Sequence, residues 1–299
     1  MHTPTAIPEA DMKADKKFRF GVLGKQPLRT GVVCPQGEFG VSTDPVELAR
    51  EAGFAPDERQ AEVLRAMADP SVKQGILNCT RQWGKSTTAA AGAVFRVVSR
   101  AGCLVVVASA SEVQAARLVG TAREMLEKLG IPVRRDGIHQ ISVLLPNGSR
   151  IVGVPRNEAT VRGLAAVSLL LIDEAAKVPD SMYHAVRPMV AVSRGDVWLM
   201  STPWGAFGFF YEAWMHGGPA WKRFSVKATE CARIPVEWLE QERSQMTRWA
   251  FQREFMAEFV RDDLSAFDAE LVEAAMDDHA APMEIDWAEF EKNRRGRCL

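Results

Sequence analysis

The residues most able to do chemistry lie between Gln74 and Thr88, in the stretch QGILNCTRQWGKSTT. The stretch opens with apolar residues typical of a buried strand and ends in an alanine-rich segment that predicts a helix over residues 85–98. Between them, the spacing matches G-x-x-x-x-G-K-[ST] except that Cys79 occupies the first glycine position. In such loops, backbone N–H groups and a helix N-terminus converge on phosphate groups. The stretch therefore predicts a strand, a phosphate-binding loop and a helix.

Each position of this loop has an expected task. Lys85 would reach the β- and γ-phosphates of ATP, and the Ser86 hydroxyl would ligate Mg²⁺. The residues expected to line the nucleotide here are Cys79, Thr80, Arg81, Gln82, Trp83, Gly84, Lys85, Ser86 and Thr87. The alternative is a Gly-Lys-Ser turn at an ordinary helix start, which the strand and helix context disfavours. Cys79 weakens the match, because a residue with a Cβ atom must then take the first turn of the loop.

A carboxylate pair follows the apolar run that begins at Val167. Asp173 and Glu174 stand at its end, and the carboxyl end of a parallel strand is where an open α/β sheet binds ligands. We expect Asp173 to hold Mg²⁺, directly or through water, and Glu174 to polarise the attacking water. The alternative is a helix N-cap followed by an acidic first turn.

Two further candidates are single polar positions near these motifs. Gln60 lies on a helix predicted over residues 54–67, upstream of the phosphate loop, where an amide can pair with adenine; the alternative is a solvated side chain. Ser201 and Thr202 end an apolar strand, where their hydroxyls would sense the γ-phosphate. The alternative for this pair is ordinary turn chemistry before Pro203.

The remaining pattern places these motifs in an α/β fold. The run over 103–109 is continuously apolar, as in a parallel strand buried on both faces, and a helix is predicted over 111–129. Pro146-Asn-Gly-Ser149 lies between two apolar segments and predicts a hairpin. Residues 234–260 predict two helices. The fold expected is a P-loop NTPase of the RecA/ASCE type, with a mainly parallel sheet flanked by helices and a small helical C-terminal subdomain.

Composition and length limit the class of protein. The chain has 299 residues, 47% of them hydrophobic and 25% charged, which is typical of a soluble globular protein. It has no apolar run near the ~20 residues of a membrane span, and its first residues are too polar for a secretory signal, so we expect no membrane contact and a location in the cytoplasm. Its five cysteines and five histidines have no metal-binding spacing, so neither a disulfide framework nor a zinc site is expected.

The expected organisation has four parts: an N-terminal arm (1–53) with one short helix, a P-loop ATPase core (54–230), a helical subdomain (231–279) and a polar tail (280–299). Charge is uneven along the chain. Residues 1–229 contain 28 Lys and Arg against 21 Asp and Glu, whereas residues 230–299 contain 9 against 17. A basic body with an acidic C-terminal portion suits a polyanion bound on one face, although two simply solvated surfaces explain the charges equally well.

In this order, the motifs resemble the ATPase domain of the large terminase subunit of tailed bacteriophages, the motor that packages DNA. The resemblance covers roughly residues 54–268 and is far more specific than any single motif. The matching segments are the Walker A-like 80–86 (TRQWGKS), the Walker B-like 169–175 (LLLIDEA), the coupling-motif-like 201–203 (STP), and 210–214 (FYEAW) and 251–259 (FQREFMAEF), which resemble stretches that follow in the family.

The resemblance implies a ring of identical subunits whose ATP hydrolysis moves double-stranded DNA into a procapsid, in the cytoplasm of a bacterial host. Its implied partners are a portal protein and a small terminase subunit. It also supplies two candidate arginines. Arg81, inside the loop, would touch the γ-phosphate in cis, and Arg162 would be inserted in trans into a neighbouring subunit's site; a surface salt bridge is the alternative for each.

Family members usually continue into an RNase H-like nuclease domain, and no nuclease activity is predicted for residues 1–299. Two other functions stay open. A helicase-like, nucleic-acid-dependent ATPase would need a second RecA-like unit, and none is visible after Thr229. A truncated, catalytically silent terminase-like protein would keep only ATP or capsid binding, which the intact Lys85, Asp173 and Glu174 disfavour.

Overall fold

The computed structural model describes residues 39–154 and 164–260, which belong to one compact unit. They contain a seven-stranded sheet in the order β3-β4-β2-β5-β6-β1-β7, in which every neighbouring pair is parallel except β3 and β4. The strands are β1 (Gln74–Cys79), β2 (Leu104–Ser109), β3 (Ser142–Leu144), β4 (Arg150–Val154), β5 (Leu169–Asp173), β6 (Asp196–Ser201) and β7 (Trp221–Val226).

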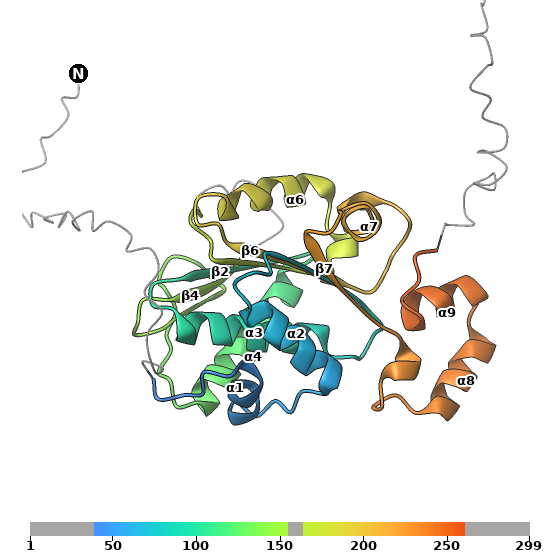
Figure 1. Cartoon of the computed structure of the whole chain (residues 1–299), viewed down its shortest axis with the longest axis horizontal. Coiled ribbons are helices and arrows are strands. Elements are labelled where there is room, and N and C mark those ends of the chain that lie inside the picture. Colours follow the sequence, from blue (N-terminus) through green and yellow to red (C-terminus); the bar gives the residue numbers. More distant parts are fainter. Residues whose placement is uncertain (1–38, 155–163, 261–299) are drawn as a thin grey trace, which may run out of the picture. The chain divides into compact units, whose positions relative to one another are not determined.

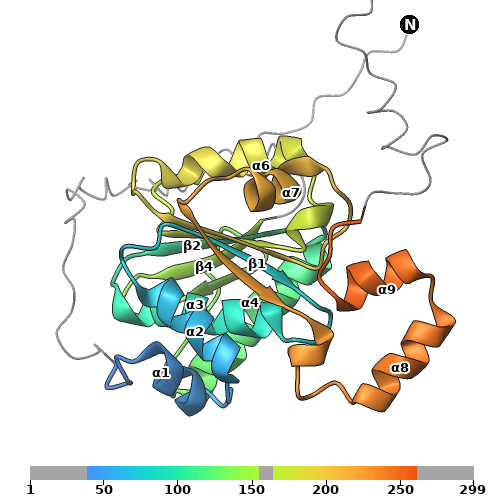
Figure 2. The same cartoon turned by 45° about the vertical axis from the view of Figure 1, so that its right-hand side comes forward.

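Helices cover both faces of the sheet (Figures 1 and 2). The four helices from α1 to α4 lie on one face, α6 and α7 lie on the other, and α8 and α9 stand beside the sheet. The α-helices are α1 (Pro45–Glu51), α2 (Glu58–Ala68), α3 (Lys85–Ser99), α4 (Glu112–Lys128), α6 (Asp180–Val186), α7 (Gly208–Met215), α8 (Val236–Gln245) and α9 (Arg248–Phe255). Short 3₁₀ turns are η1 (Ala175–Lys177), η2 (Arg187–Val190) and η3 (Ala228–Glu230).

The central strands are buried on both faces, as the continuous apolar runs predict. Along β2, Val105 and Val107 belong to the core under α1 to α4, whereas Val106 and Ala108 belong to the core under α6 and α7. Because successive side chains point to opposite faces, one apolar run supplies two cores. The predicted α/β class with a mainly parallel sheet is confirmed.

Most predicted elements are present with small shifts at their ends. The hairpin around Pro146-Asn-Gly-Ser149 is formed by β3 and β4, and residues 234–260 contain two helices. The helix predicted from residue 54 begins at Glu58, because Asp57 caps it in a reciprocal capping box with Gln60. The helices α6 and α7 and the strand β7 have no counterpart in the sequence-based prediction.

The helix α1 packs into the main core rather than standing apart from it. Its Val46, Leu48 and Ala49 are buried in the same cluster as residues of α2 and α3. The expected boundary after residue 53 therefore does not coincide with a break in packing. As a division into domains, the four-part scheme stays a prediction, and its first 38 and last 39 residues lie outside the described residues.

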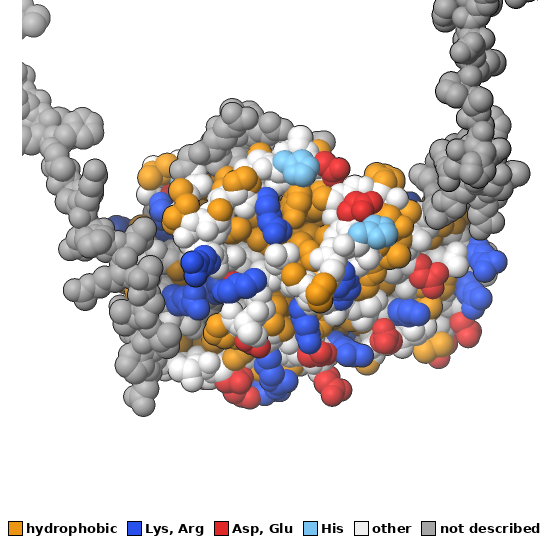
Figure 3. All heavy atoms as spheres, turned by 45° about the horizontal axis from the view of Figure 1, so that its top comes forward, with side chains coloured by type: hydrophobic (Ala, Val, Ile, Leu, Met, Phe, Trp, Pro, Cys, Tyr) orange, Lys and Arg blue, Asp and Glu red, His pale blue; other side chains and the backbone are white. Residues whose placement is uncertain are grey.

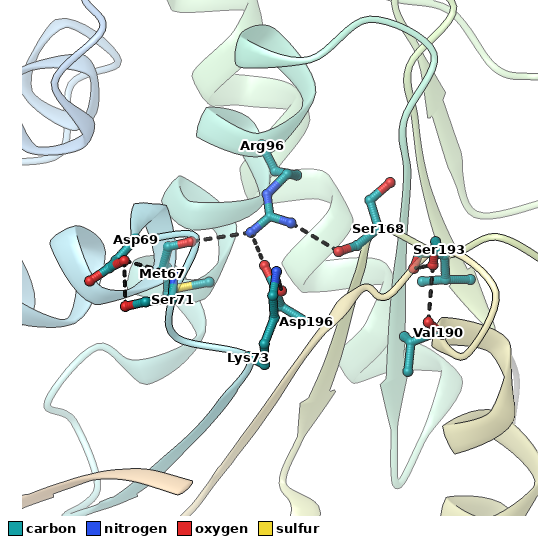
Figure 4. Close-up of polar contacts among 10 residues, drawn as sticks. Met67, Asp69, Ser71, Lys73, Arg96, Ser168, Val190, Ser193 and Asp196 are labelled. Atoms are coloured by element: carbon teal, nitrogen blue, oxygen red, sulfur yellow. Dashed lines mark hydrogen bonds and ion pairs between the residues drawn. The ribbon is translucent and has the colours of Figure 1, made fainter. Parts of the chain in front are cut away.

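A buried ion pair fixes the far end of the helix that follows the phosphate loop (Figure 4). Arg96 of α3 pairs with Asp196 at the start of β6, and its guanidinium also donates to the carbonyls of Met67 and Ser168. Lys73 approaches the same carboxylate at 3.0 Å. Removing one partner of a buried pair typically costs about 3–5 kcal/mol, because the other charge stays buried. This network holds α3 against β5 and β6 at the edge opposite the phosphate loop.

Candidate functional site

Three adjacent strands bring the predicted motifs together. The order β5-β6-β1 places the strand that ends at Ser201 between the strand of the phosphate loop and the strand of Asp173. All three are parallel, so their carboxyl ends share one edge of the sheet. Residues 87 and 117 positions apart in the sequence thereby meet around the first turn of α3.

The loop backbone explains why Cys79 is tolerated where the motif has glycine. Cys79 is the last residue of β1 and pairs with Val226, so its backbone is extended. The left-handed conformations fall later, at Gln82 (φ 62°) and Gly84 (φ 96°). The expectation that Cys79 takes a turn is therefore wrong. Burial raises the pKa of its thiol to about 12, so the side chain is a neutral part of the core.

The surroundings of Lys85 favour the binding of an anion. Its ammonium donates to the carbonyls of Cys79 (3.2 Å) and Thr80 (3.0 Å) and to the hydroxyl of Thr202 (3.0 Å). The side chain is buried, and burial lowers the pKa of Lys85. No carboxylate forms a salt bridge with it among the described residues. A buried cation held only by neutral oxygens gains most from an incoming phosphate.

Ser86 and Asp173 form the expected pair. The Ser86 hydroxyl donates to the Asp173 carboxylate at 3.0 Å, which joins α3 to the end of β5. Asp173 is 4% exposed, and burial, together with the neighbouring charge of Glu174, raises its pKa to about 6. A hydroxyl and a buried carboxylate are oxygen ligands of the kind Mg²⁺ takes, and a cation would offset the cost of ionising this carboxyl. These residues therefore fit the metal.

Glu174 follows Asp173 in a left-handed conformation (φ 50°) and begins the turn η1. Its N–H donates to the Asp173 carboxylate at 3.1 Å. A non-glycine residue in this region is uncommon, and such strain is typically kept where a side chain has to point in a specified direction. The backbone thus leaves the extended conformation of β5 at Glu174, directly after Asp173.

Thr202 and Ser201 differ in their surroundings. Thr202 accepts a hydrogen bond from Lys85, so the end of the strand between the two motifs contacts this lysine directly. Ser201 is fully buried, and its hydroxyl has no hydrogen-bond partner among the described residues. Contact of either hydroxyl with a γ-phosphate stays a prediction.

Gln60 of α2 supports the loop by binding the backbone of Trp83. The Gln60 amide donates to the Trp83 carbonyl at 2.7 Å and accepts from the N–H of Asp57 at 2.9 Å. Gln60 is fully buried, so pairing with adenine would require these bonds to open. The Trp83 indole lies in the main core, and the Trp83 carbonyl is the part of this residue that accepts the hydrogen bond from Gln60. The adenine role of Gln60 stays a prediction.

Arg233 was not singled out from the sequence, yet it contacts the same loop. Its guanidinium donates to the Trp83 carbonyl and lies 3.1 Å from the Asp57 carboxylate. Arg233 is 150 positions away from Trp83 in the chain, in a stretch without a recognisable motif, so no local signal marks it. Asp57, Gln60 and Arg233 together hold the turn that precedes Gly84.

The residue Glu254 of α9 binds the other side of the loop and was also missed. Its carboxylate pairs with Arg81, and its carbonyl accepts from the Thr80 hydroxyl at 3.1 Å. Nearby, the Asn78 amide donates to the carbonyl of Ala257 at 2.8 Å. These bonds attach α9 to β1 and the phosphate loop. Arg81 is half-exposed, and its expected contact with a γ-phosphate would require it to leave Glu254.

Two of the remaining expected positions lie on the loop and on the helix that follows it. Gln82 is exposed at the tip of the loop, and Thr87 is partly exposed on the first turn of α3. Arg162 lies outside the described residues. The structure thus brings Lys85, Ser86 and the Asp173–Glu174 pair together.

Comparison with known families shows to which protein family the chain belongs. Residues 76–274, more than half of the chain, match the family "Terminase large subunit, T4likevirus-type, N-terminal". The chain belongs to the terminase large subunit family. Its matched region contains the phosphate loop, the carboxylate pair and the strand between them, so the family resemblance read from these motifs is confirmed. Family membership places the chain among the proteins of bacteriophage DNA packaging.

Solved structures of large terminases share the fold. The ATPase domain of the Thermus phage P74-26 large terminase is 24% identical, with a TM-score of 0.62 over 71% of this chain and 97% of that chain. The HK97 bacteriophage large terminase is 17% identical, with a TM-score of 0.58 over 68% of this chain. The large terminase of another thermophilic bacteriophage, solved in complex with ADP, is 14% identical, with a TM-score of 0.58 over 68% of this chain.

The terminase chain spans about half the length of the two longer structures, 50% of the HK97 chain and 53% of the chain solved with ADP. A search of curated proteins gives no match. Within the described part of the chain, no helix has the length and apolar character needed to cross a membrane.

Proposed function

We propose that this terminase chain is an ATPase whose hydrolysis drives double-stranded DNA into a procapsid. The observation that carries the proposal is the meeting of Lys85, the Ser86–Asp173 pair and Glu174 at one sheet edge, within a chain of this family. Large-terminase structures bound to ADP and to ATP-γ-S support the nucleotide class. A portal protein, a small terminase subunit and a ring of identical subunits are the partners expected for such a motor.

Each residue has a distinct role in the proposed reaction. Lys85 exchanges its carbonyl partners for phosphate oxygens, and the N-terminus of α3 contributes its N–H groups. Ser86 and Asp173 would hold Mg²⁺, which neutralises charge on the phosphates when bound. Glu174 orients and polarises the attacking water, and Thr202 transmits the state of Lys85 to β6. Arg162 of a neighbouring subunit would stabilise charge on the transferring phosphoryl group.

The proposal is tested by measuring phosphate release from Mg-ATP, with and without linear duplex DNA. We expect the wild-type chain to release phosphate and DNA to accelerate the release. The variant Glu174→Gln should release none above background. Equal release from both proteins would contradict the assignment of Glu174, and hydrolysis by the wild type that no DNA affects would favour an ATPase that is not a DNA motor.

DNA binding can be tested in the same experiment. On the face that Figure 3 shows, Lys and Arg side chains are mixed with apolar, acidic and His side chains. A motor needs sequence-independent contacts with phosphates, and these contacts weaken as salt increases. Stimulation by DNA should therefore decline between about 50 and 200 mM salt, whereas basal hydrolysis should change little.

A further inference from the structure

The turn after the carboxylate pair places a lysine against Glu174. Residues Ala175–Lys177 form the 3₁₀ turn η1, and the N–H of Lys177 donates to the Glu174 carbonyl at 2.8 Å. In a 3₁₀ turn, side chains three positions apart lie one above the other. The Lys177 ammonium accordingly lies 3.2 Å from one carboxylate oxygen, Oε2, of Glu174. The backbone itself builds this contact.

An aromatic ring holds the lysine from the other side. The Lys177 ammonium lies 5.2 Å from the ring centroid of Trp204, within the range of a cation–π contact. Trp204 is only two residues beyond Thr202, which contacts Lys85, so the ring belongs to the same strand end as the phosphate site. It stays 41% exposed, next to a hollow of about 810 Å³ lined by Lys177, Pro179 and Phe207 among others.

The same ring also receives a cation from α9. The Arg253 guanidinium lies 4.5 Å from the Trp204 centroid, and Arg253 is itself paired with Glu254 at 3.3 Å. Glu254 also binds Arg81 of the phosphate loop. Successive contacts therefore connect Glu174 with Lys177, Lys177 with Trp204, and Trp204 with this loop through the residues Arg253 and Glu254. Among the described residues, Trp204 is thus in contact with both η1 and α9.

We propose that Lys177 is a positioning residue for Glu174 and that the Trp204 ring keeps Lys177 in place. Lys177 occupies Oε2 of the carboxylate and leaves Oε1 for the attacking water. A base oriented by a third group is a recurring arrangement in hydrolytic sites. The inference rests on the proposed function, because it assigns to Glu174 the activation of water.

Steady-state ATP hydrolysis by variants of the whole chain tests the inference. Lys177→Met keeps the length of the side chain and removes its charge, so kcat should fall about 10- to 100-fold, the size of effect seen when a group that orients a metal ligand is lost. KM and nucleotide affinity should stay within about twofold, because Lys177 does not touch phosphate in this assignment. Lys177→Arg should restore most of kcat.

Trp204 is tested in the same assay. Trp204→Leu should lower kcat less than Lys177→Met does, and Trp204→Phe should retain most activity, because a phenyl ring still attracts a cation. The matched control is Lys222→Met. Lys222 lies 5.9 Å from the Phe224 ring, a similar cation–π contact on β7, and it forms no salt bridge among the described residues, so its loss should leave kcat unchanged.

The single variants separate this inference from the proposed function. An unchanged or increased kcat for Lys177→Met, or a loss of nucleotide affinity as large as the loss of kcat, would overturn the positioning role while leaving the ATPase assignment intact. Full activity of Glu174→Gln alone would instead overturn the proposed function.

Discussion

At the residue scale, the site contains two buried charges whose natural partners are ligands. Lys85 is buried against neutral oxygens, and Asp173 is buried beside a second carboxylate. Burial is the largest cause of both shifts, since it lowers the pKa of Lys85 and raises that of Asp173. Each charge is costly until a group of opposite sign arrives, and in the proposed reaction that group is a phosphate for Lys85 and a metal ion for Asp173. In the free protein, both buried charges lower the free energy of unfolding.

The pKa of Asp173, raised from 3.8 to about 6, leads to a prediction for the metal-free protein. Between about pH 4 and 6, the unfolded chain has released this proton while the folded chain keeps it, so stability falls as pH rises through that window. Above it, the loss amounts to at most about 3 kcal/mol. Asp173→Asn should therefore raise Tm at pH 8 and change it little at pH 4.

Thermal unfolding in a chelating buffer is the measurement, with Glu124→Gln, at an exposed position of α4, as a control that should shift Tm at neither pH. A lower Tm for Asp173→Asn at pH 8 would mean that its ionised carboxylate is stabilising, which is the opposite of the expected sign.

At the element scale, local patterns were enough to find the chemistry but not its supports. The phosphate loop, the strand ending at Asp173 and the strand ending at Thr202 are each marked by apolar runs followed by polar residues. Their adjacency follows from the parallel sheet. By contrast, β7 is an edge strand in which Trp221, Phe224 and Val226 are buried without strict alternation, so a period of two does not reveal it.

The contacts of Glu254 and Arg233 with the loop were not predictable either. Both join segments more than 100 positions apart, and an isolated Arg or Glu on a helix or loop has the pattern of an ordinary solvated side chain. Lys177 is different. It lies three positions after Glu174, and in a helical turn that spacing places two side chains on the same face, so the spacing was a signal available in the sequence.

Gly84 in the loop and Gly120 in α4 offer a matched pair of glycine substitutions. Gly84 has φ 96°, and an added Cβ atom would lie 2.9 Å from the Gln60 amide nitrogen. Gly84→Ala should therefore distort the loop through roughly 1–3 kcal/mol of strain and weaken nucleotide binding about 5- to 150-fold. Gly120→Ala, in α4 with open space around it, should leave binding unchanged and raise stability by about 0.5–1 kcal/mol.

Isothermal titration with a non-hydrolysable ATP analogue measures the first effect, and chemical unfolding measures the second. Equal affinity of the Gly84→Ala and wild-type proteins would show that this turn does not shape the nucleotide site.

At the scale of the whole molecule, the proposed motor depends on contacts between subunits. A trans arginine accelerates hydrolysis by about 10³–10⁵ where it has been measured. If Arg162 has this role, the isolated chain should hydrolyse ATP slowly, and its activity should increase more steeply than linearly with protein concentration. Mixing Arg162→Ala with Glu174→Gln protein should restore some turnover, because a mixed interface pairs an intact Glu174 with an intact Arg162.

Linear dependence on concentration together with no rescue on mixing would leave Arg162 as a structural residue. Arg81, released from Glu254, would then be the candidate for stabilising charge on the transferring phosphoryl group from within the same subunit.

The central claim is that one sheet edge divides ATP binding from ATP hydrolysis between Lys85 and Glu174. The most direct measurement determines nucleotide affinity and single-turnover hydrolysis for Lys85→Ala and Glu174→Gln side by side. We predict that Lys85→Ala loses affinity, because it removes the buried cation, and that Glu174→Gln binds ATP as tightly as the wild type without cleaving it. Hydrolysis by Glu174→Gln at the wild-type rate, or unchanged affinity of Lys85→Ala, would contradict the account.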